Sequence, residues 1–399
     1  MFFRSVLFSL FTLAVATLPA RAQQTGSDIQ VGGVFSAKEI PVTVEANDAQ
    51  VGALARAAFS AHGAYRVVAS GNARIQLRKV SDTSIAVTCQ SGGAQTEQTV
   101  SGGDWVEATL RACDAAVVVT GRSQNLRPFF AGRLAFVSDR TGKKEIYSSD
   151  LFLQSVRPLT NLNSISITPH WVRGGQEVLF TTYHNNNFTD IYAVNVASRQ
   201  LRDVVVGVRG TTIGAVSNPV NGDLAFASSA RGNMDIYTAN ASGKNTKALA
   251  RTDGVESDPS WAVNGSELYF TSGPNGRPSI HVIGTSGGTP RRIATPGYGY
   301  ATEPAANPVE TGKIAFTFQR NGVFGIGIVD TRTGEVKAIT KAGSFMHPTW
   351  CADGRHLVAT QVAGQANSLV LLDSETGKTA RLSPAQMANC TEADYLAAP

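Results

Sequence analysis

The sequence predicts a mainly β protein: a six-bladed β-propeller of four-stranded antiparallel blades, preceded by a small α/β domain. Two observations predict the propeller. Three short motifs recur with one pitch of about 45 residues, and turn residues divide each repeat into four short strands. One four-stranded sheet cannot bury both of its faces, whereas blades stacked around an axis cover one another. A third observation, helical periodicity between short strands before the repeats, predicts the α/β domain.

The first motif is a short apolar strand that ends in phenylalanine. Leu357-Val358-Ala359 is a degraded sixth copy of it. Six copies predict six blades, enough for a closed ring. The five clear copies end at Phe136, Phe180, Phe226, Phe270 and Phe316.

The second motif is an acidic residue followed by Ile and Tyr, with weaker forms at Ile280-His281 and Ile326-Gly327. A turn separates it from the Phe strand in nearly every copy, which predicts an antiparallel pair. Its clear copies are Glu145-Ile146-Tyr147, Asp190-Ile191-Tyr192 and Asp235-Ile236-Tyr237.

The third motif is Pro-x-Trp with Gly four residues after Trp. Only five strands of this type follow the first Phe strand, so we expect the tail near residues 392–396 to supply the innermost strand of the first blade. The clear copies run from Pro169 to Trp171, Pro259 to Trp261 and Pro348 to Trp350, and are followed by Gly175, Gly265 and Gly354.

The first residues have the three parts of a secretory signal. Arg4 is the charged start, residues 5–18 are apolar, and Ala20-Arg21-Ala22 is a small-residue cleavage site. The apolar run is shorter than the roughly 20 residues of a membrane-spanning helix. We therefore expect cleavage between Ala22 and Gln23 and a soluble periplasmic product.

The remaining chain divides by composition. Residues 1–22 are the expected signal peptide, 23–37 a flexible lead, 38–122 the α/β domain, 123–130 a linker and 131–399 the propeller. Within the α/β domain, residues 90–103 are left without an element. Its expected elements are a strand at 40–45, a helix from Asn47 or Asp48 to Gly63, strands at 65–69, 75–79 and 84–89, a helix from Asp104, and a last buried strand at 115–119.

Four cysteines in an exported chain predict disulfides, Cys89 with Cys113 and Cys351 with Cys390, although four cysteines allow three pairings. The charge names no partner. Loss of Arg4 and Arg21 with the signal lowers the formal charge from +5 to +3, and no Lys/Arg block is present, which argues against nucleic acid.

The signal, the small α/β domain and the three repeat motifs together resemble the TolB family, the periplasmic propellers of the Tol-Pal envelope system. Trp261-Ala262-Val263-Asn264-Gly265 is similar to the Trp-Ser-Pro-Asp-Gly turn of that family, without its Pro. The resemblance implies a non-enzymatic scaffold that docks an envelope lipoprotein such as Pal and contributes to envelope integrity. It implies a TolA-like inner-membrane partner less directly, because the lead matches no TolA-binding segment.

Two features of the sequence bear on other classes of function. Gly284-Thr285-Ser286-Gly287-Gly288 has the Gly-x-Ser-x-Gly spacing of hydrolases, but it lies between strands, where a plain turn is favoured over a nucleophile elbow. A metal-dependent polysaccharide lyase or a glycan-binding propeller is the alternative, because imidazoles can converge on a propeller axis. Since the histidines occupy different repeat positions, the sequence predicts no metal and no cofactor. The four histidines compared are His170, His184, His281 and His347.

A partner-binding face follows from propeller topology. Loops that enter the innermost strands and loops between the two middle strands emerge on one side, around the channel mouth. Arg and aromatic side chains anchor many interfaces, and this face is rich in them. The expected partner-binding residues are Arg140, His184, Asn186, Arg231, Asp258, Arg277, Tyr298, Tyr300, Glu303, Arg320, Phe345 and His347.

Overall fold

The computed structural model describes residues 39–183, 188–364, 366–385, 387 and 389–399. The expected signal peptide, its cleavage site at Ala22 and Gln23, and the expected lead lie outside these residues. Within the described part, no helix is both long enough and apolar enough to cross a membrane.

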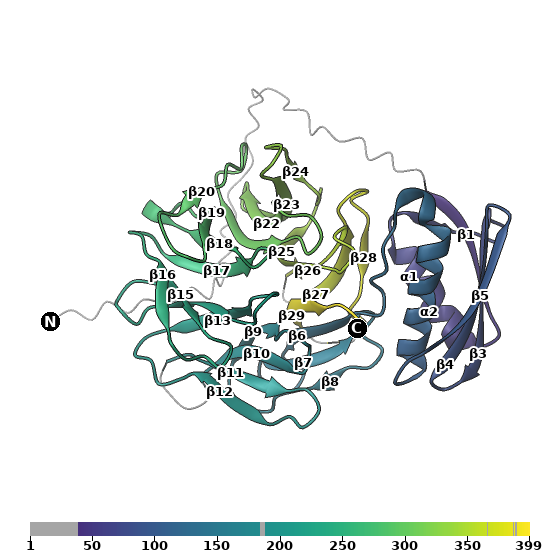
Figure 1. Ribbon diagram of the computed structural model, residues 1–399, viewed down its shortest axis with the longest axis horizontal. Coiled ribbons are helices and arrows are strands. Elements are labelled where there is room, and N and C mark those ends of the chain that lie inside the picture. The colour runs from purple at the N-terminus through teal and green to yellow at the C-terminus, as the bar shows by residue number, and fades with distance from the viewer. Residues whose placement is uncertain (1–38, 184–187, 365, 386, 388) are drawn as a thin grey trace, which may run out of the picture. The chain divides into compact units, whose positions relative to one another are not determined.

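The first domain is a five-stranded sheet in the order β2-β1-β3-β4-β5, with two helices on one side of it (Figure 1). Strand β1 is parallel to both of its neighbours, and β3, β4 and β5 form an antiparallel meander. Asp48 caps α1 by accepting the amides of Gln50 and Val51. The elements are β1 (Ile40–Ala46), α1 (Ala49–Ala61), β2 (Tyr65–Val67), β3 (Ala73–Ser81), β4 (Ser84–Ser91), β5 (Ala94–Ser101), α2 (Trp105–Thr120) and the 3₁₀ turn η1 (Arg122–Gln124).

Two expectations for this domain are wrong. Residues 115–119 do not form a strand, because α2 continues to Thr120 and buries Cys113, Ala116, Val117 and Thr120 on one face at helical spacing. Residues 94–101 do form a strand, β5, although nearly all of its side chains are exposed. An edge strand with nearly all of its side chains exposed leaves no alternating pattern in the sequence.

The repeats form a six-bladed propeller of four-stranded antiparallel sheets, as predicted (Figure 1). Each blade after the first runs in chain order from the channel outward. The first blade contains β6 (Arg133–Ser138), β7 (Glu145–Asp150) and β8 (Arg157–Pro158); the second β9 (Ser166–Trp171), β10 (Glu177–Thr182), β11 (Asp190–Asn195) and β12 (Leu201–Val205); the third β13 (Thr212–Ser217), β14 (Leu224–Ser228), β15 (Asp235–Ala239) and β16 (Lys247–Ala250). The fourth contains β17 (Glu256–Trp261), β18 (Glu267–Ser272), the turn η2 (Pro274–Gly276), β19 (Ser279–Gly284) and β20 (Arg291–Arg292); the fifth β21 (Ala301–Ala306), β22 (Lys313–Arg320), β23 (Val323–Asp330) and β24 (Val336–Ala338); the sixth β25 (Ser344–Trp350), β26 (His356–Ala363), β27 (Ala366–Asp373) and β28 (Thr379–Arg381).

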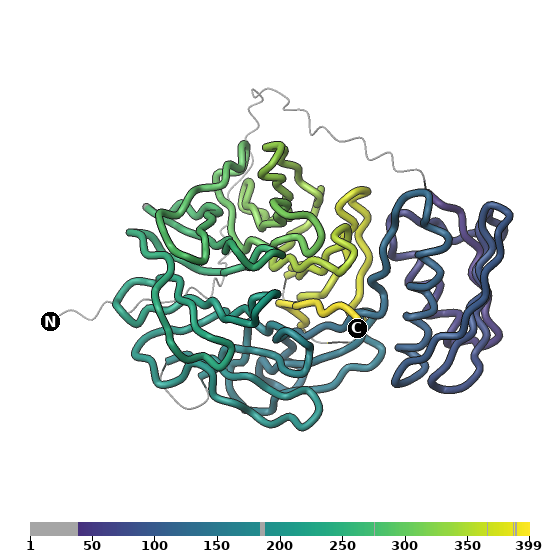
Figure 2. The backbone as a smooth tube through the Cα atoms, in the orientation of Figure 1, coloured from purple at the N-terminus to yellow at the C-terminus, as the bar shows by residue number. Residues whose placement is uncertain are grey.

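The ring closes through the last strand, as the count of strands predicts. Strand β29 (Cys390–Leu396) pairs antiparallel with β6 and completes the first blade from the channel side. Figure 2 shows the end of the chain returning to lie beside the start of the propeller. Closure is therefore non-covalent.

The repeat motifs have separate packing roles. The five motif phenylalanines are at most 1% exposed. Phe136, for example, stacks on Tyr147 of the second motif, with ring centroids 5.9 Å apart. The acidic residue of that motif caps the loop into the next blade: Glu145 accepts the amides of Leu162 and Asn163 at 2.7 and 2.9 Å. A buried carboxylate at this point satisfies backbone donors that would otherwise be unpaired.

Asp114 of α2 holds the segment that joins the two domains. Its Oδ1 accepts the amides of Phe129 and Phe130, both at 2.8 Å, and its Oδ2 accepts the amide of Ala131 at 2.9 Å. Burial raises the pKa of Asp114 to about 6, although these three hydrogen bonds favour the carboxylate. The segment is thus fixed to the helix side of the α/β domain.

The cysteines differ from expectation. All four lie in the described part of the chain, where each is buried and none is joined in a disulfide. Cys89 and Cys113 pack in the α/β core, and Cys351 and Cys390 pack in the first and last blades. Burial raises the pKa of the Cys89 thiol to about 11, which keeps it protonated and unreactive at neutral pH.

Candidate functional site

The innermost strands of the six blades enclose a channel with a cavity of about 540 Å³. Strands β9, β13, β17, β21, β25 and β29 each contribute residues to its wall. Each of these strands contains a register shift against its neighbour in the blade. A bulge at one place in every blade turns one residue toward the axis.

The bulges create a ring of six equivalent residues, which we call the channel ring. All six have left-handed backbone, with φ between +50° and +69°, and they recur every 44 to 46 residues. Only one of them is glycine, so five residues hold a conformation that L-amino acids seldom adopt. The channel ring consists of Thr168, Gly214, Asp258, Glu303, His347 and Glu392.

Hydrogen bonds between neighbouring blades hold the channel ring. The amide of Gly214 donates to Thr181 Oγ1 at 3.1 Å, in the blade before it. In the same way the Glu303 amide donates to a threonine hydroxyl, Thr271 Oγ1, at 3.0 Å. The repeated contact explains the bulge: the left-handed residue turns its amide out of its own sheet and toward the adjacent one.

Glu303 and His347 form a pair within the channel ring. His347 Nδ1 lies 3.1 Å from Glu303 Oε1, and the His347 amide donates to Glu303 Oε2 at 2.8 Å. Enclosure in the channel lowers the pKa of His347, but the nearby carboxylates of Glu303, Glu392 and Asp258 outweigh it, and the net shift is upward. The imidazole is therefore held toward its charged form.

Asp258 is exposed to the channel cavity, which the walls of the blades enclose. This enclosure, together with the charge of Glu303, raises the pKa of Asp258. The ring thus combines three acids and one imidazole around one opening. Such a set offers hydrogen bonds and ion pairs to a polar or cationic group of a partner.

A second layer lies deeper in the channel. Asp394 Oδ2 accepts the Trp171 amide at 2.8 Å and lies 3.1 Å from His170 Nδ1. The indole Nε1 of Trp171 donates to the Asp394 carbonyl at 3.3 Å. The other motif tryptophans repeat this last bond in alternate blades, Trp261 to the Val216 carbonyl and Trp350 to the Ala305 carbonyl.

The structure brings together only part of the expected partner-binding set. Asp258, Glu303 and His347 lie in the channel ring. Tyr298 and Tyr300 are half-buried in the loop that enters the fifth blade, where Tyr298 packs on Phe318. Four expected arginines lie exposed outside the ring, in or beside loops between middle strands: Arg140, Arg231, Arg277 and Arg320.

Three other expected residues are buried or lie outside the described part of the chain. Phe345 is only 3% exposed and belongs to the core between the fifth and sixth blades, so its side chain is not on the surface of the mouth. His184 and Asn186 lie outside the described residues. The Gly-x-Ser-x-Gly sequence forms a turn after β19 that leads to β20, a strand and not a helix.

Sequence reasoning missed Thr168, Glu392 and Asp394. Thr168 could have been found from the sequence, because the channel-ring residue directly precedes Pro in four blades. Thr168 itself precedes Pro169. Glu392 and Asp394 lack that mark, since Ala393 replaces the proline in the closing strand.

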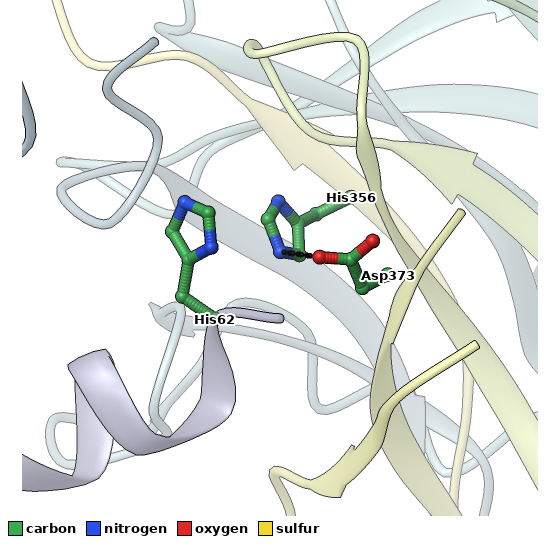
Figure 3. Close-up of side chains that lie close together, drawn as sticks. All are labelled: His62, His356 and Asp373. Carbon is green, nitrogen blue, oxygen red and sulfur yellow. Dashed lines mark ion pairs between the residues drawn. The ribbon is translucent and has the colours of Figure 1, made fainter. Parts of the chain in front are cut away.

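A second polar cluster is buried where α1 meets the sixth blade, and sequence reasoning gave no sign of it. Figure 3 shows His62, from the end of α1, facing His356 and Asp373 of the blade. The two imidazole centroids are 4.4 Å apart. His356 Nδ1 lies 2.6 Å from Asp353 Oδ2, and its Nε2 lies 3.1 Å from Asp373 Oδ2.

Among the described residues, His62, His356 and Asp373 are the one group of three potential metal donors. Their bonding does not suit a metal. His62 Nδ1 accepts the Ala64 amide at 3.1 Å, so the neutral ring carries its proton on Nε2 and has no lone pair to offer. Asp373 Oδ2 already binds the guanidinium of Arg355 at 2.8 and 2.9 Å. The cluster is an ion-pair network of the sixth blade, and the neutral ring of His62 packs against it.

Comparison with known proteins agrees with the repeat architecture. A family model described as the TolB β-propeller domain matches residues 119–393. The chain belongs to this family. Two proteins named as TolB homologs are similar over part of the chain. That of Chlorobium luteolum is 30% identical over 178 residues (45% of this chain and 39% of that protein), and that of Chlorobaculum tepidum is 33% identical over 146 residues (36% and 32%).

The similarity to these two TolB homologs spans two fifths or less of their length. The crystal structure of TolB from Acinetobacter baumannii superposes with a TM-score of 0.76 at 16% identity, covering 90% of this chain and 96% of that one. At that identity the likeness shows the TolB fold, including the small domain before the propeller.

Proposed function

We propose that this chain is a periplasmic, non-enzymatic scaffold that holds an envelope protein, a Pal-like lipoprotein, at the mouth of its channel. In this role it contributes to the integrity of the cell envelope. Membership of the TolB propeller family supports the general role. The proposal extends to no TolA-like partner, because the sequence offers no matching lead segment.

The observation that carries the proposal is the channel ring. The ring presents three acids and an imidazole to the channel, and its five residues other than glycine hold left-handed backbone. Hydrogen bonds between blades support this backbone, as at Glu303 and His347. Strained residues kept in this way are characteristic of binding sites. The ring is therefore a polar centre that a partner side chain can enter.

The surroundings of the ring fit a protein partner. Exposed arginines lie outside it, and four large apolar side chains in other loops that enter innermost strands or join middle strands are about half exposed. Arg and large apolar groups around a polar centre form the usual composition of a protein interface. The four apolar residues are Ile165 (46%), Tyr183 (46%), Phe188 (46%) and Val255 (54%).

The test is a calorimetric titration of the chain from Gln23 to Pro399 with a purified, unacylated Pal-like lipoprotein of the same organism. The double variant Tyr300→Ala, His347→Ala removes one aromatic and one ring side chain. We expect it to weaken binding about tenfold or more. The matched control, Glu335→Ala, changes an exposed residue in the turn between β23 and β24.

The outcomes separate the alternatives. Binding by the native chain and the control, with loss in the double variant, supports the proposal. Equal binding by all three forms places the partner elsewhere. An absence of binding by the native chain, together with binding of acidic oligosaccharides, favours the glycan-binding alternative.

A further inference from the structure

The contact between His62 and the sixth blade joins the two domains through charged groups that are removed from water. His62, His356 and Asp373 are each at most 1% exposed. Phe129 stacks on His356 at 4.3 Å with an interplanar angle of 16°, and it also contacts His62. Water therefore cannot screen the charges in this contact.

Geometry fixes the charge of His356. Each of its two ring nitrogens faces a carboxylate oxygen, Asp353 Oδ2 on one side and Asp373 Oδ2 on the other. The negative charges of these two carboxylates, 2.6 and 3.1 Å from the ring nitrogens, favour the imidazolium form of His356. In agreement, these carboxylates outweigh the effect of burial and raise the pKa of His356 to about 9.

The surroundings of His62 favour the neutral form of its ring. Its Nδ1 accepts a hydrogen bond from the Ala64 amide. A proton on Nδ1 would remove this acceptor and place two donors against each other. Three cations face it from the blade, namely His356, Arg355 and Lys378, against the single carboxylate of Asp373. The neighbouring rings of Tyr65, Phe129 and Phe130 are uncharged at neutral pH. His62 can thus occupy this position only as the neutral base.

The contact is also tight on the side of the helix. Gly63 packs directly against the Asp373 carboxylate and the Thr376 hydroxyl, leaving no room for a Cβ. The His62 carbonyl accepts a hydrogen bond from Lys378 Nζ at 3.4 Å. Because the contact is packed this closely, a small movement cannot make room for a charge on His62. Protonation of His62 therefore requires α1 to move away from the sixth blade.

We infer that the contact of His62 with the sixth blade is an acid-sensitive junction: it is closed while His62 is neutral, and protonation of His62 opens the contact between α1 and the propeller. In the closed state, burial and the charge of His356 hold the pKa of His62 well below its usual value. The open state binds a proton at about pH 6.5, so the closed state loses stability as pH falls below that value.

Hydrogen exchange of the chain from Gln23 to Pro399 tests the junction. The amides of Ala64 and Tyr65 depend on it, because they donate to the ring and to the carbonyl of His62. After correction for intrinsic rates, their protection should be constant from pH 8 to 6.5. Below that it should fall by up to about tenfold per pH unit. Amides of β14 in the third blade serve as the internal reference.

The non-titrating variant His62→Asn keeps an acceptor for the Ala64 amide and should abolish the acid loss. His281→Asn makes the same change in the fourth blade and should preserve it. If His62→Asn does not fold, Lys378→Gln serves instead. Because this variant removes one of the cations that face His62, it should reduce the loss of amide protection at pH 5. Protection that is independent of pH in the native chain, or an unchanged acid loss in His62→Asn or Lys378→Gln, would overturn the inference.

Discussion

The carboxylate of Asp394 accepts the backbone amide of Trp171 at 2.8 Å across 223 residues of sequence. It also accepts a hydrogen bond from Thr349 at 3.2 Å, so one side chain ties the closing strand to the second and the sixth blade. The propeller closes without a covalent bond, and this residue is the polar centre of the closure.

Replacement of Asp394 should therefore weaken the whole ring. Asp394→Ala leaves the Trp171 amide without its acceptor, and we expect the free energy of unfolding to fall by about 1–3 kcal/mol. Urea unfolding measures the change. Asp253→Ala, at an exposed aspartate, is the matched control and should change stability by less than about 0.5 kcal/mol. Equal effects of the two variants would contradict this role.

The motif tryptophans should act as links between blades. Trp350→Phe keeps most of the buried ring but removes the 2.9 Å bond from Nε1 to the Ala305 carbonyl. We expect a loss of about 1–3 kcal/mol, from the missing bond and the smaller ring. Trp105→Phe, in the α/β domain, makes the same change without a link between blades. Thermal unfolding of both variants checks the prediction, which fails if Trp105→Phe is the more damaging.

Gly63 should tolerate no side chain. Its Cβ would collide with Asp373 and Thr376, so Gly63→Ala must displace the carboxylate that binds His356. We expect Gly63→Ala to accelerate exchange of the Ala64 and Tyr65 amides at neutral pH. Gly299→Ala is the control, because nothing lies within 4 Å of an added Cβ there. Unchanged exchange in Gly63→Ala would show that the contact is loose.

Stability should also fall in mild alkali. The pKa of His356 is raised to about 9 in the folded chain, above its unfolded value near 6.5. The contribution of His356 is therefore complete below pH 6.5 and is lost as pH rises toward 9. From pH 6.5 to 8.5 we expect a loss on the order of 2 kcal/mol, measured by urea unfolding. His281→Gln should retain this slope, and a flat profile in the native chain would contradict the charged state of His356.

The propeller could be predicted from the sequence because its motifs are packing residues repeated once per blade. The Phe of the first motif and the Tyr of the second pack together in each complete copy, as Phe136 and Tyr147 do in the first blade. The closing strand followed from counting strands. The last turn of α2 could not be predicted in this way. Val117 and its neighbours have a high intrinsic preference for strands, and they are helical here because of the face that they bury. Edge strand β5 buries almost nothing and leaves no pattern.

The site was harder to predict than the fold. Asp258, Glu303 and His347 were predicted because they lie near loops that enter the innermost strands, whereas Glu392 lies in the closing strand at the end of the chain, where no such loop was considered. The pairing of His62 with His356 joins positions 294 residues apart, and no repeat or spacing relates them. Contacts between domains depend on how two finished folds meet, which sequence periodicity does not encode.

The central claim is that a partner occupies the channel mouth, and carbodiimide labelling of carboxylates tests it most directly. Glu303 and Glu392 would be labelled in the chain alone and in the presence of the Pal-like lipoprotein, with Glu335 as the reference on an exposed turn. We predict that the partner reduces labelling of both ring residues and leaves Glu335 unchanged. Unchanged labelling of the ring in a saturated complex would contradict the claim.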